Sequence, residues 1–116
     1  MKIAVLVKQV PGSESSLPIK DDQKWIDESV ASYVMNPPDN YAIEEALLIK
    51  EELGEGEVVI VSKGPERIQK VIREGLAKGA DRAIHLKEDT MATDPLNIAK
   101  SFSTVLKEEN FDLIFT

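Results

Sequence analysis

The stretch Ile3-Ala4-Val5-Leu6-Val7 is an unbroken aliphatic run close to the start of the chain. A strand with one face in water alternates apolar and polar residues, but this run contains no polar residue. Continuous β-branched and aliphatic runs are typical of strands that are covered on both faces, as in a parallel sheet. The run therefore predicts a buried strand of an α/β fold.

Helical patterns and further aliphatic runs alternate along the rest of the chain. We expect strands at 57–62, 80–86 and 111–115, helices at 36–53, 64–78 and 94–106, and a polar loop at 87–93. This alternation predicts a parallel sheet with right-handed crossovers in a single domain, residues 1–116. Because no residues follow the last strand to cover it, we expect a fold that is truncated after its fourth main strand.

Each predicted helix carries an apolar stripe at helical spacing, which should face the sheet. Gly75 lies on the second stripe and indicates a close approach of helix and sheet. The stripes comprise Ala42, Ile43, Ala46, Leu47, Ile49 and Leu53 in the first helix, Ile68, Val71, Ile72, Gly75 and Leu76 in the second, and Ile98, Ala99, Phe102, Val105 and Leu106 in the third.

The connection 9–35 between the first strand and the first helix is long. Such connections usually have 2–6 residues, and much longer ones are usually functional or lid-like. Pro11-Gly12 is a turn signal at which the chain leaves the strand. Two short extended pieces, 17–19 and 24–26, flank an acidic turn, and we expect them to form a small hairpin.

The composition excludes several classes of partner and site. The 116-residue chain has a formal net charge of −7 and a pI near 4.7, whereas nucleic-acid binding needs clustered basic residues. We therefore expect neither nucleic acid nor an anionic membrane surface as a partner. The chain has no cysteine and one histidine, so we expect no zinc or iron–sulfur site and no metal ligands.

No apolar run in the sequence approaches the roughly 20 residues of a membrane-spanning helix. The run at 3–7 is also shorter than the apolar part of a signal peptide, which has about 7–15 residues. We therefore expect no membrane insertion and a cytoplasmic protein.

Several predicted strands end near one another at one edge of the sheet. In open α/β sheets, ligands bind beyond the carboxyl ends of the strands, where the strand order reverses. The strand ends 7–8, 62–64 and 86–87 should lie there, together with the helix mouth 36–39, because a helix that follows a strand begins at that edge. We expect these segments to line one crevice. No glycine-rich dinucleotide motif or P-loop follows the first strand.

The helix mouth Asn36-Pro37-Pro38-Asp39 has two interpretations, which the residues leave open. Asn36 can be a plain N-cap, with Pro37 at the first helical position and Asp39 reaching back to the cap or favouring the helix dipole. Alternatively, the mouth is part of a binding site. Its prolines remove N–H groups that would hold an anion, so it would suit adenine or ribose better than phosphate.

Three other polar residues near the strand ends have structural interpretations. Lys8 and Lys63 are expected to be solvated unless a phosphate lies nearby, and His85 is expected to be structural. No Ser/His/Asp arrangement and no pair of catalytic carboxylates can be assembled from the sequence.

Four segments, in this order and spacing, resemble the N-terminal portion of the electron transfer flavoprotein beta subunit family. They are KIAVLVKQVP at 2–11, MNPPDNYAIEEAL at 35–47, VIVSKGP at 59–65 and GLAKGADRA at 75–83. The resemblance implies a Rossmann-like open parallel sheet with helices on both faces, a three-layer α/β/α arrangement. It also implies an electron carrier subunit that is not itself an enzyme.

The resemblance further implies a heterodimer with an alpha subunit that carries most of the FAD site. The beta subunit would bury a nucleotide, either AMP or, in electron-bifurcating members, a second FAD. The pair would carry electrons from acyl-CoA or other dehydrogenases to an acceptor. By motif position, nucleotide contacts would fall on Leu6, Asn36, Pro37, Pro38, Asp39 and Lys63, and the strand-end crevice adds Val7, Lys8, Ser62 and Gly64.

The sequence departs from the family at the helix mouth, where the family often has an aromatic residue at Pro38 and an acidic residue at Asn40. In the family, a glycine-containing phosphate loop follows the fourth strand, which here ends at Thr116. Two alternatives of other classes stay open. A universal-stress-type or adenylating ATP-binding protein needs such a loop with Ser or Thr. A receiver-like signalling domain needs an acidic pair after the first strand, where residues 8–10 have none.

Overall fold

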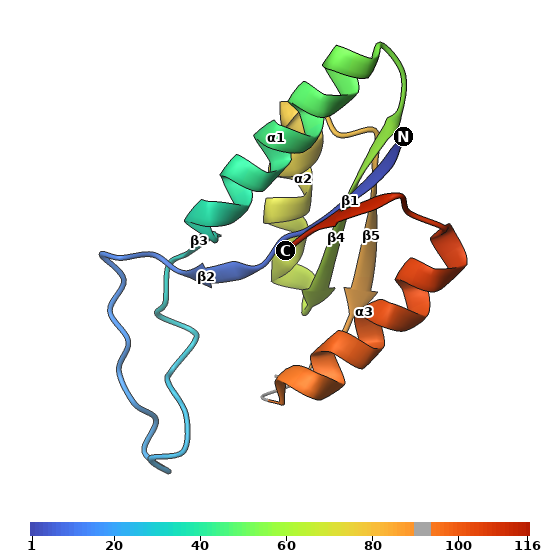
Figure 1. Cartoon of the computed structure of the whole chain (residues 1–116). Helices are drawn as coiled ribbons and strands as arrows, with labels where there is room; N and C mark the ends of the chain where they lie inside the picture. Colours follow the sequence, from blue (N-terminus) through green and yellow to red (C-terminus); the bar gives the residue numbers. More distant parts are fainter. Residues whose placement is uncertain (90–93) are drawn as a thin grey trace.

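The computed structural model describes residues 1–89 and 94–116. A parallel four-stranded sheet in the order β5–β4–β1–β6 lies between helices, and a two-stranded ribbon, β2–β3, extends beside it (Figure 1). The strands are β1 (Lys2–Leu6), β2 (Gln9–Pro11), β3 (Tyr33–Met35), β4 (Glu57–Gly64), β5 (Arg82–Lys87) and β6 (Leu113–Phe115), and the helices are α1 (Pro37–Leu53), the 3-10 turn η1 (Glu66–Ile68), α2 (Gln69–Lys78) and α3 (Pro95–Glu109).

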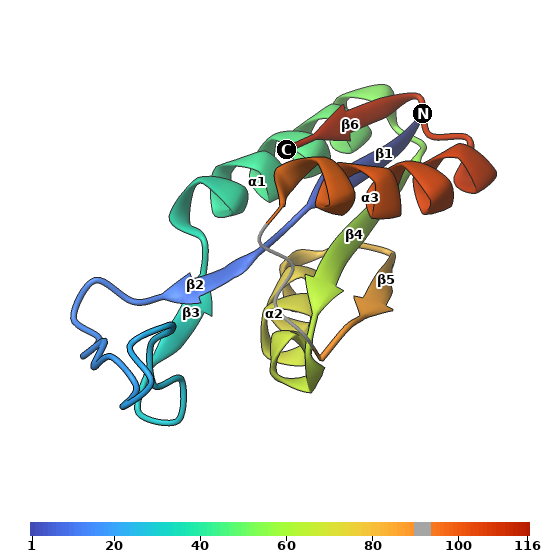
Figure 2. The ribbon, with the colours of Figure 1, turned by 90° about the horizontal axis from the view of Figure 1, so that it is seen from below.

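The chain crosses from β1 to β4 to β5, and then returns to the other side of β1 to form β6. The strands of this sheet pair in parallel, and Ala4 of β1 lies opposite both Val59 of β4 and Ile114 of β6. Because the direction of the crossovers reverses at β1, right-handed crossovers place α1 and α2 on one face and α3 on the other (Figure 2). The predicted Rossmann-like three-layer α/β/α fold is confirmed.

Both faces of β1 and β4 are covered, which explains their unbroken aliphatic runs. One face packs against α1 and α2, and the other packs against α3. Full burial of each Val or Ile side chain contributes roughly 1.5–3 kcal/mol, so these two strands stabilise the fold strongly. The first core includes Ile3, Val5, Ile43, Ala46, Val58, Ile60, Ile68 and Val71, and the second includes Ala4, Val59 and Val61 with Phe102 and Leu106 packed against them.

The predicted helix signals are confirmed at three places. Helix α1 starts with Pro37 and closes at Gly54, whose φ of 72° is left-handed and favours glycine. At the start of α3, the Asp94 side chain accepts a hydrogen bond from the Leu96 N–H. On α2, a Cβ added to Gly75 would lie 2.8 Å from Cγ1 of Ile60, so the close approach of helix and sheet does require glycine.

The predicted apolar stripes were too wide, because Leu53, Leu76 and Ala99 are exposed. The 17 residues of α1 span about 25 Å at 1.5 Å per residue, whereas β1 has five residues and spans about 17 Å. Leu53, in the last turn, therefore extends beyond the strand. Pro65 was also misplaced, since it precedes the η1 turn and is not the first residue of α2.

The connection between β1 and α1 holds a ribbon that the sequence did not predict. Gln9–Pro11 pairs antiparallel with Tyr33–Met35, although Pro11 had been assigned to a turn. Proline is tolerated on an edge strand because its missing N–H faces away from the partner strand. The predicted hairpin at 17–19 and 24–26 is reduced to a single bridge between Ile19 and Ile26. Residues 12–32 extend away from the sheet as a long loop (Figure 1).

Two sequence expectations concern the remaining loop and the membrane. Lys87 ends strand β5 and does not begin the predicted loop 87–93. Residues 90–93 of that loop lie outside the described residues. In the two described ranges, none of the helices combines the length and the apolar character that a bilayer crossing requires.

Ion pairs join the amino edge of the sheet to the end of α3. The Lys2 ammonium lies 2.8 Å from Oε2 of Glu109 and 3.9 Å from Oε2 of Glu57. The Arg82 guanidinium contacts both glutamates as well. The hydrogen bonds from Lys2 and Arg82 hold the pKa of the Glu109 carboxyl below its ordinary value. Nearby, hydrogen bonds from the Lys50 ammonium and the Val58 N–H lower the pKa of Asp81.

These lowered pKa values predict a loss of stability in acid. A carboxylate whose pKa is lower in the folded state stabilises the fold above its unfolded pKa, and this contribution is lost as the pH falls through the folded pKa. The ordinary values are 4.5 for Glu109 and 3.8 for Asp81. We expect the melting temperature, measured by circular dichroism, to fall below about pH 4.5. The difference in melting temperature between wild type and Asp81→Asn should shrink there, and a constant difference would contradict the prediction.

Candidate functional site

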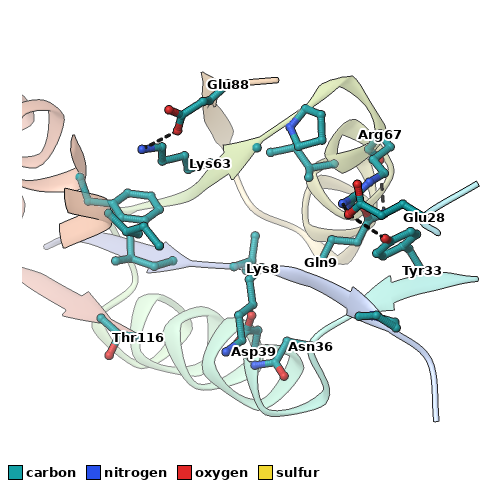
Figure 3. A pocket seen from close by; sticks show the side chains of 18 of the residues that line it. Lys8, Gln9, Glu28, Tyr33, Asn36, Asp39, Lys63, Arg67, Glu88 and Thr116 are labelled. Carbon is teal, nitrogen blue, oxygen red and sulfur yellow. Dashed lines mark hydrogen bonds and ion pairs between the residues drawn. The ribbon is translucent and has the colours of Figure 1, made fainter. Parts of the chain in front are cut away.

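A cavity of about 740 Å³ opens at the carboxyl edge of the sheet. It lies where β1 and β6 adjoin, which is the point at which the strand order reverses and at which open α/β sheets bind ligands. Figure 3 shows its polar side chains in three groups around the opening. The described residues that line it are Leu6, Val7, Lys8, Gln9, Pro11, Trp25, Ile26, Glu28, Tyr33, Asn36, Pro38, Asp39, Lys63, Gly64, Pro65, Arg67, Ile68, Glu88, Ile98, Phe102 and Thr116.

The first polar group joins the end of β1 to the start of α1. Asp39 is buried, and its Oδ2 accepts a hydrogen bond of 2.8 Å from the backbone N–H of Lys8. Its Oδ1 accepts another, also of 2.8 Å, from the Asn36 side-chain amide. The backbone N–H of Asn36 donates in turn to the Lys8 carbonyl at 2.9 Å. Both oxygens of the carboxylate are therefore engaged in fixing the geometry of the cavity.

This arrangement corrects the interpretation of Asn36 as a side-chain cap. Asn36 occupies the N-cap position, but its side chain makes no capping hydrogen bond to the helix backbone. Its amide donates to Asp39 instead. Asp39 does reach back to the N-cap residue, as predicted, but through the side chain. Lys8 is exposed, as expected, and takes part through its backbone.

The second polar group surrounds Lys63, and here the expectation of a solvated lysine was wrong. The Lys63 side chain is only 13% exposed, and its ammonium lies 2.7 Å from Oε2 of Glu88. It also donates a hydrogen bond of 2.9 Å to the Ser101 hydroxyl on α3. An anionic ligand at this point would compete with Glu88 for the ammonium.

The third polar group centres on Arg67 in η1. Its guanidinium donates to Oε1 of Gln9 at 2.6 Å and to Oε1 of Glu28 at 3.2 Å, and it lies 3.8 Å from the centre of the Tyr33 ring. The Tyr33 hydroxyl donates to Glu28 at 3.0 Å. Burial, together with this hydrogen bond, raises the pKa of Tyr33. Sequence reasoning missed the group, because it joins residues as far as 39 positions apart in loops.

Of the residues predicted for the site, Pro37 and Ser62 are the two that do not appear in this lining. Ser62 is fully buried, and its hydroxyl donates to the Val7 carbonyl at 2.7 Å, so it supports the end of β1 from behind. His85 lies just outside the cavity, where its Nε2–H donates to the Gly64 carbonyl at 2.9 Å. This contact agrees with the structural role expected for His85.

The cavity combines an apolar lining with a few polar groups. Leu6, Trp25, Ile26 and Phe102 are among the apolar side chains, and such linings are typical of sites for flat organic ligands. Within the described part of the chain, no three His, Asp or Glu side chains gather in a way that could hold a metal ion. The geometry is therefore that of a binding site for a partly aromatic molecule with hydrogen-bonding edges.

Comparison with known proteins places this geometry in a family. A family model described as the electron transfer flavoprotein domain matches residues 24–116. The chain belongs to the electron transfer flavoprotein family. The resemblance stated from the sequence motifs is confirmed.

Individual relatives of the electron transfer flavoprotein family support the assignment. "Electron transfer flavoprotein subunit beta" of Methylophilus methylotrophus is 38% identical over 99% of this chain and 44% of its own length. The protein of that name in Bradyrhizobium diazoefficiens is 40% identical over 98% of this chain and 45% of its own. That of Thermoanaerobacterium thermosaccharolyticum is 37% identical, with 99% and 44% covered. The chain spans less than half the length of the curated relatives it matches.

The buried Asp39 carboxylate leads to a prediction about stability. Asp39→Ala should lower the free energy of unfolding by about 1–3 kcal/mol, because it leaves the Lys8 N–H without its acceptor. Asn36→Ala keeps the bond between Lys8 and Asp39 and should cost less. Urea denaturation of both variants measures the difference. Equal midpoints for the two variants would show that the carboxylate does not hold β1.

Proposed function

We propose that this chain forms the nucleotide-binding part of an electron transfer flavoprotein beta subunit. In this proposal, residues 1–116 belong to one nucleotide-binding domain that pairs with an alpha subunit carrying most of the FAD site. The pair carries electrons from acyl-CoA or other dehydrogenases to an acceptor. The chain itself is an electron carrier subunit in the cytoplasm, and the flavin supplies the redox chemistry.

The observation that carries the proposal is the position of the cavity. It opens where the strand order reverses, and Leu6, Asn36, Pro38, Asp39 and Lys63 all line it. These are positions at which the family resemblance implies nucleotide contacts. We propose that the cavity holds the adenosine part of AMP or of a second FAD.

The polar groups favour adenine or ribose over phosphate at the start of α1. Pro37 and Pro38 have no N–H to offer an anion, and the Asp39 N–H donates to the Asn36 carbonyl at 3.0 Å. The Asp39 carboxylate adds a negative charge at the same place. The start of α1 is therefore a poor anion site, in contrast to most helix N-termini. The phosphate contacts are assigned to the loop that follows the fourth strand in the family.

The identity of the bound nucleotide tests this function directly. We expect the full chain, purified with its partner subunit, to be yellow and to release FAD together with either AMP or additional FAD on denaturation. Mass spectrometry of the released material measures both. A complex without flavin would refute the electron-carrier function, and release of ATP alone would favour a universal-stress-type or adenylating ATP-binding protein.

Asn36 provides a test of the site itself. Its side-chain oxygen is not used by the contact to Asp39, which runs through the amide nitrogen. We expect Asn36→Ala to lower nucleotide retention about tenfold while costing at most about 1 kcal/mol of stability, because one ligand hydrogen bond of roughly 1.4 kcal/mol is lost. Asn40→Ala, one turn along the same helix, is the matched control and should retain nucleotide normally. Equal retention by both variants would exclude Asn36 from the site.

A further inference from the structure

One wall of the cavity comes from residues 12–32, the long loop between β2 and β3. Trp25 and Ile26 of this loop line the cavity. Among the described residues, the hydrogen bonds that leave the loop for the rest of the fold end on Glu28. They come from the Tyr33 hydroxyl and from the Arg67 guanidinium. The placement of the wall therefore depends on a single side chain of the loop.

Arg67 is the residue that connects this loop to the main sheet. It follows β4 and contacts three different segments: Gln9 of β2, Glu28 of the loop and the ring of Tyr33 in β3. Its own carbonyl accepts a hydrogen bond of 3.3 Å from the Gln9 side-chain amide. The planar guanidinium is suited to this combination, since it donates in two directions while one face stacks on an aromatic ring. Figure 3 shows the four side chains gathered on one side of the cavity.

We propose that Arg67 is a positioning residue for the ligand of this cavity. By holding Glu28 and Tyr33, it keeps residues 12–32 where Trp25 and Ile26 close one wall, and it thereby sets how fast a bound nucleotide leaves. The inference rests on the proposed nucleotide site, and it adds a residue outside the four segments that carry the family resemblance.

A direct contact between Arg67 and an anionic ligand is the competing role, and the geometry disfavours it. The Glu28 carboxylate compensates the charge of the guanidinium, and Gln9 occupies a further N–H. The two roles predict opposite effects for Glu28→Gln. If Arg67 positions the loop, loss of the carboxylate frees the loop and nucleotide is lost faster. If Arg67 binds the ligand, loss of the carboxylate frees the guanidinium and retention improves.

The experiment uses the full chain with its partner subunit and four variants: Arg67→Gln, Arg67→Lys, Glu28→Gln and Arg73→Gln. Arg73 lies on α2, bonds to Gln69 at 3.1 Å and is not among the cavity residues, so Arg73→Gln is the control for loss of an arginine. The first measurement is the rate at which AMP and FAD are lost during dialysis. The second is the rate of trypsin cleavage at Lys20 and Lys24 within the loop, with the fragments identified by mass spectrometry.

We expect nucleotide loss to be about tenfold faster in Arg67→Gln and Glu28→Gln, with faster cleavage in the loop, and unchanged in Arg73→Gln. Arg67→Lys should resemble Arg67→Gln, because an ammonium keeps the charge but cannot reproduce the fork and the stacking. Slower nucleotide loss in Glu28→Gln, or wild-type behaviour of Arg67→Lys, would overturn the positioning role.

Two further outcomes separate this inference from the proposed function. If the wild-type complex retains nucleotide and the Arg67 variants lose it at the wild-type rate, the positioning role is refuted while the nucleotide site stands. If the wild-type complex contains no nucleotide at all, the proposed function fails and the inference fails with it.

Discussion

The hydrogen bond from the Lys8 N–H to the buried Asp39 carboxylate is the contact on which the site depends. It joins the end of β1, the central strand, to the first turn of α1. A carboxylate that accepts a backbone N–H makes a charge-assisted bond, and its charge is favoured near a helix N-terminus. Because β1 and α1 carry most of the residues expected to contact nucleotide, the shape of the cavity follows from this one contact.

The same contact explains why the helix mouth differs from an ordinary anion site. A helix N-terminus attracts phosphate only while its first N–H groups are free. Here two are absent at Pro37 and Pro38, and the third, at Asp39, is engaged with Asn36. The negative carboxylate lies at the same place. The mouth is therefore adapted to neutral hydrogen-bonding groups, which in a nucleotide belong to the base and the sugar.

The sequence predicted the sheet, the helices and the edge at which the cavity lies, because these depend on periodicity and on topology. It did not predict the partners of the site residues. Glu88, which pairs with Lys63, and Glu28, which pairs with Arg67, lie outside the regular elements, where no periodic pattern fixes the position of a side chain. It also missed the β2–β3 ribbon, because strands of three residues with a proline have no detectable alternation.

The two sides of the cavity differ in how firmly they are held, and this difference decides which side opens. The side formed by β1 and α1 is fixed by a buried carboxylate and by strands covered on both faces. The side formed by residues 12–32 is held through Glu28 and Arg67, whose side chains are 33% and 30% exposed. Half-exposed ion pairs are screened by water and contribute little, about 0–1 kcal/mol, whereas breaking the first side would expose core residues. A ligand that enters or leaves this cavity therefore passes on the side of the loop, and the loop is the element through which exchange can be controlled.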